Sequence, residues 1–141
     1  MKITEKQIKE IAEELEAGMK VYLNKDTMEI RSILDWEDII DTEPWEEELD
    51  KIYNEWSDFV IITKMESREA YQVMENFTGE INDKHLREEL EKILSRKSPF
   101  ANFKAEIESS PYRQKWFDFR LNAYIEYVKD QLESEGFEFE E

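Results

Sequence analysis

Cysteine is absent from this 141-residue sequence, and histidine occurs once, as His85. The lack of cysteine excludes disulfide bonds, thiolate catalysis, iron–sulfur clusters and cysteine-based zinc sites. A single histidine leaves no multi-histidine metal site. Gly18, Gly79 and Gly136 are the only glycines, and the sequence has neither a glycine-rich phosphate loop nor a dinucleotide fingerprint. These absences remove most cofactor-dependent chemistry, and we expect no cofactor.

Long apolar runs are also missing. No window approaches the roughly 18 apolar residues of a membrane-spanning helix, and residues 1–6 are polar, unlike a signal peptide. We therefore expect a cytoplasmic protein that does not enter a membrane. The length favours a single domain over residues 1–141, which would bury about two thirds of the surface exposed in the unfolded chain.

The charge is strongly unbalanced. Asp and Glu number 36 against 19 Lys and Arg, which gives a net charge of −17. This balance repels nucleic acids and anionic membranes at long range, and we do not expect nucleic-acid binding. Screening at physiological salt acts over about 8 Å, so a local cationic surface would still bind an anion.

Residues 35–58 hold eleven carboxylates opposed by Lys51 alone. One interpretation is a solvated face that Trp36, Trp45 and Trp56 anchor to the core. A second is mimicry of nucleic acid, in which carboxylates replace phosphates and bind a DNA-binding protein. Calcium is disfavoured, because no Asp-x-Asp-x-Asp-Gly loop is present. The carboxylates dense enough for calcium are Asp35, Glu37, Asp38 and Asp41.

Residues 96–120 carry the opposite charge. Six cations face three carboxylates there, so the segment sums to +3 and the remaining residues to −20. The cations are Arg96, Lys97, Lys104, Arg113, Lys115 and Arg120, and the rings are Phe100, Phe103, Tyr112, Trp116, Phe117 and Phe119. A cationic aromatic segment in an anionic protein is the best candidate for a binding surface.

We therefore predict that this segment binds a protein or an anionic ligand. Phe100 and Phe103 would form one wall of a pocket, with cations at its mouth and helix N-termini adding N–H donors. The competing interpretation places both rings in the core, as is usual for rings at i and i+3. The broad aromatic stripe at 116–127 then indicates core packing or a homodimer interface. The predicted binding residues are Arg96, Lys97, Phe100, Phe103, Lys104, Arg113, Trp116 and Arg120.

Local patterns predict an α+β fold, with a small, mostly antiparallel sheet of about three strands and a C-terminal helical cluster. Thr4 and Gln7 have the spacing of a capping box, and Gly18 suits the end of that helix. Residues 19–33 predict a β-hairpin whose second strand starts at Met28. The apolar run at 59–62 predicts a buried, central strand.

Five further helices follow from capping and proline signals. We expect them to begin at Pro44, after a cap at Ser67, after Asn82 or Asp83, at Pro99 and at Pro111. Gly136 would end the last helix, and the acidic tail at 137–141 would fray or pair as an edge strand.

Residues 98–104, Ser-Pro-Phe-Ala-Asn-Phe-Lys, resemble the Pro-Phe-x-x-Phe-Lys signature of uncharacterised protein family 0158, a group of small bacterial proteins. The segments at 21–25, 71–77 and 116–119 resemble further motifs of that family in the same order. Met28 departs from the pattern, which has a turn glycine there. The resemblance implies no activity and no catalytic residues.

A non-catalytic binding or regulatory protein is therefore the leading interpretation. The alternative from another class is a carboxylate-based, hydrolase-like enzyme that uses His85 in a cleft. A histidine base needs an orienting partner, and Lys84 and Arg87 beside His85 do not supply one. The sequence also lacks a Gly-x-Ser-x-Gly nucleophile elbow.

Overall fold

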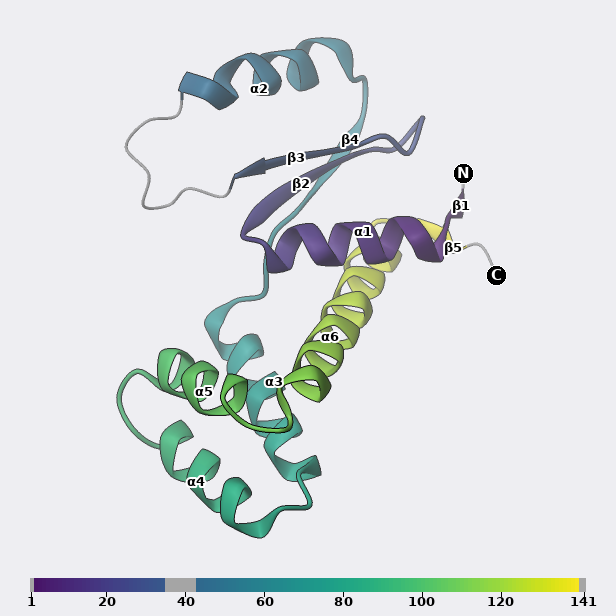
Figure 1. Ribbon diagram of the computed structural model, residues 1–141. Coiled ribbons are helices and arrows are strands. Elements are labelled where there is room, and N and C mark those ends of the chain that lie inside the picture. Colours follow the sequence, from purple (N-terminus) through teal and green to yellow (C-terminus); the bar gives the residue numbers. More distant parts are fainter. Residues whose placement is uncertain (1, 35–42, 140–141) are drawn as a thin grey trace. The chain divides into compact units, whose positions relative to one another are not determined.

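The computed structural model describes residues 2–34 and 43–139 (Figure 1). The chain forms two compact units. Residues 1–64 and 124–141 make the first, and residues 65–123, inserted between them in the sequence, make the second. Helix α6 (Arg113–Ser134) contributes residues to both. The predicted α+β class is confirmed, whereas the single domain stays a prediction.

A three-stranded antiparallel sheet organises the first unit. It contains β2 (Met19–Asn24), β3 (Ile30–Leu34) and β4 (Phe59–Ile62) in the order β3-β2-β4. The predicted hairpin and strand count are confirmed. The central position predicted for 59–62 is wrong, because β4 lies at an edge of the sheet that residues 2–34 and 43–139 form. An apolar run indicates that side chains are buried; it does not indicate whether both backbone edges of a strand are paired.

The hairpin turn explains why the motif has a glycine at the position of Met28. The Asn24 side chain accepts hydrogen bonds from the backbone N–H groups of Asp26 (2.8 Å) and Thr27 (3.2 Å). Met28 follows with φ of +65°, a left-handed conformation that glycine adopts without strain. The second strand therefore begins at Ile30, two residues later than predicted, and the buried Met28 side chain belongs to the turn.

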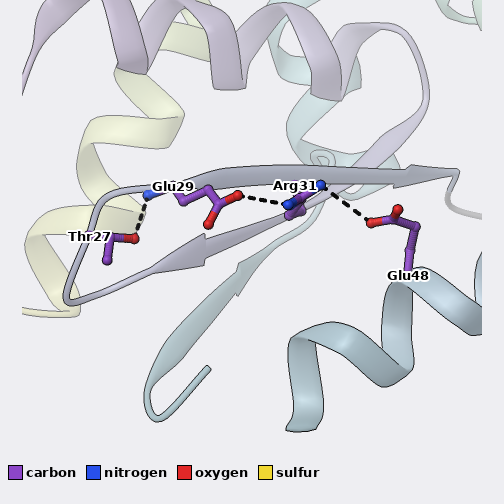
Figure 2. Close-up of polar contacts among 4 residues, drawn as sticks. All are labelled: Thr27, Glu29, Arg31 and Glu48. Carbon is purple, nitrogen blue, oxygen red and sulfur yellow. Dashed lines mark hydrogen bonds and ion pairs between the residues drawn. The ribbon is translucent and has the colours of Figure 1, made fainter. Parts of the chain in front are cut away.

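Helices α1 (Glu5–Glu16) and α2 (Glu43–Glu55) lie on opposite sides of the sheet (Figure 1). From α2, Ile52 packs against Tyr22 and Ile33. Arg31 on β3 pairs with Glu29 (2.8 Å) and with Glu48 of α2 (3.6 Å), as Figure 2 shows. Half-buried side chains around this cluster include Trp45 and Trp56, which confirms both as anchors. Trp36 and Asp35–Asp41 lie outside the described residues.

The ends of α1 and α6 follow the predicted caps. Thr4 and Gln7 make both bonds of the capping box, and Gly18 and Gly136 have φ of +89° and +86°. Beyond Gly136, β5 (Glu138–Phe139) pairs in parallel with β1 (Lys2–Ile3). The tail therefore pairs as a strand over those two residues.

The second unit is helical. It contains α3 (Ser67–Glu80), α4 (Lys84–Leu94), α5 (Pro99–Glu108) and the first part of α6. The Trp116 ring is central to its core, because its centroid lies 5.0 Å from that of Phe103 and 5.2 Å from that of Phe77. Tyr71, half-buried against this core, donates from its hydroxyl to the Leu94 carbonyl at 2.8 Å.

Helix starts in the second unit follow the predictions in part. Asp83 caps α4 by accepting from the Leu86 N–H, and α5 begins at Pro99. Ser67 is the first residue of α3 and not its cap. Helix α6 begins two residues after Pro111, because residues 110–112 form a turn in which the Ser110 hydroxyl accepts from the Tyr112 N–H at 3.1 Å.

Candidate functional site

The side chains of the predicted binding residues differ in their burial. Phe103 and Trp116 are only 1% and 7% exposed, so the core interpretation holds for both rings. Phe100 is 42% exposed, one of the few large apolar side chains exposed in the described part of the chain. The predicted pocket wall of Phe100 and Phe103 is therefore not formed. Arg96, Lys97, Lys104 and Arg113 are exposed, and Arg120 is half-buried.

The turn before α5 fixes where Phe100 lies. Ser98 adopts a left-handed conformation (φ +55°, ψ +50°) directly before Pro99, which costs a non-glycine residue about 1–2 kcal/mol. Asn102 holds this turn, since its side-chain amide donates to the Lys97 carbonyl and its backbone N–H to the Ser98 carbonyl, both at 3.2 Å. The backbone strain therefore lies at the residue directly before the helix that carries Phe100.

The first turn of α5 has no anionic group to balance its positive dipole end. The Ser98 side chain makes no capping hydrogen bond, and the first turn contains no acidic residue. N–H groups at a helix start usually have a side-chain acceptor. This end of α5 thus adds partial positive charge beside Arg96 and Lys97.

Three cations lie within four residues of Phe100 in the sequence, and none has an ion-pair partner in the described part of the protein. The ion pairs there do not involve Arg96, Lys97 or Lys104. Lys92, one turn earlier, does pair with Glu89 at 3.6 Å. Phe100 and Lys104 are four residues apart and share one side of α5. We call Arg96, Lys97, Phe100 and Lys104 the α5 surface.

The remaining predicted cations have contacts of their own. The Arg113 guanidinium lies 4.7 Å from the centroid of the Phe117 ring, and the Lys115 ammonium 5.4 Å from that of Tyr112. Arg120 also has an interaction within the chain. The ten residues of α5 place about 15 Å of helix between its start and the loop before α6. Along the chain, Arg96 and Lys97 therefore precede α5, whereas Arg113, Lys115 and Arg120 follow it.

Comparison with protein families decides the relationship suggested by the sequence motifs. The model of Uncharacterised protein family (UPF0158) matches residues 4–141. The chain belongs to this family. Searches of curated proteins and of solved structures each found no match. The UPF0158 match spans both compact units, and it describes no activity.

The other candidate groups of this UPF0158 protein give weaker evidence for a functional site. His85 is exposed in the first turn of α4, and its side chain makes no hydrogen bond among the described residues. Within residues 2–34 and 43–139, no three histidine or carboxylate side chains gather as metal ligands. No helix in that part is long and apolar enough to cross a membrane. The carboxylates considered for calcium lie outside it.

Sequence reasoning missed one exposed apolar surface of the UPF0158 protein, in its first unit. Ile61 belongs to the strand predicted to be buried, yet it is 46% exposed, and Tyr53 of α2 is 58% exposed. Helical spacing did not separate Tyr53 from Ile52, which is buried against the sheet. Strand alternation within 59–62 was the available signal for Ile61.

Proposed function

We propose that this UPF0158 protein is a non-catalytic binding or regulatory protein that engages an acidic partner through the α5 surface. The observation that carries the proposal is an exposed ring, Phe100, within four residues of three cations that have no ion pair among the described residues. In a protein of net charge −17, such cations are a local exception that an anionic partner would recognise.

Magnitudes favour a protein segment over a small anion as the partner. An exposed ion pair contributes about 0.2–1 kcal/mol, so three cations supply about 2 kcal/mol. Covering the rest of the Phe100 ring adds about 1 kcal/mol. This total is below the cost of association, about 4 kcal/mol or more. A partner must therefore make further contacts, as an acidic polypeptide lying along the roughly 15 Å of α5 would do.

Native co-purification with mass spectrometry tests the proposal without presuming the partner. The variant Lys97→Glu/Lys104→Glu reverses two charges of the α5 surface. Its matched control is Lys6→Glu/Lys9→Glu, which makes the same change of net charge on exposed positions of α1. We expect the first variant to lose partners that the wild type and the control retain. Equal recovery from all three proteins at ordinary salt removes the α5 surface from consideration.

A second variant tests the ring separately from the charges. Phe100→Ala removes the exposed apolar contact and leaves Arg96, Lys97 and Lys104 unchanged. We expect weaker recovery of the same partners, whereas Phe100→Tyr, which keeps a ring, should retain them. Full recovery with Phe100→Ala would show that charge alone accounts for binding and would contradict the role of the ring.

A further inference from the structure

Among the described residues, no strand pairs with the outer backbone edge of β4. The Lys25 N–H donates to the Asp58 carbonyl at 3.1 Å, so Asp58 faces β2. Backbone groups alternate along an antiparallel strand, and Val60 and Ile62 therefore also face β2. Phe59 and Ile61 direct their N–H and C=O groups to the other side, where the sheet order places no further strand among the described residues.

This edge lacks the features that usually protect edge strands. Such strands often carry a lysine, a proline or a bulge, whereas β4 reads Phe-Val-Ile-Ile. Ile61 is exposed and lies opposite Tyr22 in the ladder. Tyr53 is exposed as well, with its ring centroid 5.3 Å from that of Phe59. An apolar surface of Tyr53, Phe59 and Ile61 thus borders this outer edge.

We propose that a second copy of this chain pairs with this edge, β4 antiparallel to β4, with Ile61 on the two-fold axis. Residues opposite each other must lie on the same face of the sheet, so the two residue numbers of a pair have the same parity. A two-fold axis at Ile61 places Val60 opposite Ile62 of the other copy. The buried faces of the two sheets then join into one six-stranded sheet.

Charge complementarity favours a second copy of the chain as the partner of β4, and it favours this register of pairing. Asp58 and Lys64 flank β4 with opposite signs, both are exposed, and neither belongs to an ion pair in the described residues. If Ile61 lies on the axis and the ladder continues to Lys64, Asp58 of each copy lies opposite Lys64 of the other copy. The two-fold symmetry gives two such pairs. An axis at Val60 would instead set Asp58 opposite the apolar Ile62. The self-complementary pattern is the one a two-fold interface requires.

Backbone geometry agrees with the register. Because Ile61 directs its polar groups outward, two Ile61 residues on the axis form a hydrogen-bonded pair that exchanges two N–H···O bonds. Phe59 would pair with Thr63 in the same way. The Thr63 carbonyl already accepts from the Tyr127 hydroxyl at 2.9 Å, and its second lone pair remains for the ladder.

Disulfide trapping tests the register directly, because the chain has no cysteine of its own. Residues in a hydrogen-bonded pair have Cα atoms about 5.5 Å apart, within the range of a disulfide, about 4.4–6.8 Å. We expect Ile61→Cys to form a covalent dimer at least about tenfold faster than Lys9→Cys, which is exposed on α1, on the other side of the sheet from Tyr53 and α2. Equal rates, or no dimer from Ile61→Cys, overturn the proposal.

Charge reversal tests the same interface without cysteine, by sedimentation velocity at physiological salt, where repulsion between two −17 chains is screened. Asp58→Lys and Lys64→Asp should each weaken dimerisation about tenfold, and the double variant should restore it. Glu133→Lys, an exposed change of equal charge, should not weaken it. A wild type that stays monomeric at its highest soluble concentration, or a double variant that fails to recover, overturns the proposal.

Discussion

Replacing Phe100 and Phe103 by alanine in turn tests the division between surface and core on α5. Phe103 is 1% exposed, and its centroid lies 5.0 Å from that of Trp116. Phe103→Ala should therefore lower the free energy of unfolding by about 3–5 kcal/mol, since it removes a buried ring and leaves a cavity. Phe100 is 42% exposed and is not part of that core cluster. Its replacement loses only part of a transfer free energy of about 1.5–3 kcal/mol and leaves no cavity, so about 1 kcal/mol is expected.

Urea denaturation followed by far-UV circular dichroism measures both values. The midpoint should fall much further for Phe103→Ala than for Phe100→Ala, with the slope unchanged, because the surface exposed on unfolding is nearly the same. Phe103→Leu is the control that keeps most of the buried volume, and it should lie between them. Equal losses from Phe100→Ala and Phe103→Ala would refute the assignment of one ring to the surface and the other to the core.

Three further predictions concern the first unit and use the same assay. Met28→Gly should be more stable than Met28→Ala by about 1 kcal/mol, because both lose the side chain but only alanine resists a φ of +65°. Thr4→Ala should cost about 1 kcal/mol, since it removes the acceptor of the Gln7 N–H bond at 3.1 Å. Arg31→Gln should cost less than about 1 kcal/mol, because its pair with Glu48 is exposed.

The elements with a local chemical cause could be predicted closely. The capping box at Thr4 and the positive φ at Gly18 both depend on residues within one turn. The edge position of β4 depends on which strands pair across the sequence, and its four apolar residues do not encode that. The late start of α6 depends on the Ser110 hydroxyl, which caps the preceding turn instead of opening a helix at Pro111.

The sequence identified the segment that contains the candidate site, but not which of its side chains are exposed. Ile107 lies seven residues after Phe100, which rotates it by only about 20° around the helix axis. Ile107 is nevertheless fully buried whereas Phe100 is exposed. Position along the axis therefore separates these two residues, and it depends on where neighbouring helices reach. Helical periodicity describes only the angle around the axis, so it could not distinguish them.

The most direct test of the proposed function is the ratio of partner recovered by Lys97→Glu/Lys104→Glu to that recovered by Lys6→Glu/Lys9→Glu in native co-purification. Both variants shift the net charge equally, so the ratio isolates the α5 surface from the field of the whole protein. We predict a ratio well below one at ordinary salt. The ratio should approach one at high salt, because salt also screens the interaction that the control variant retains. A ratio of one at ordinary salt, with both variants folded, would contradict the proposed function.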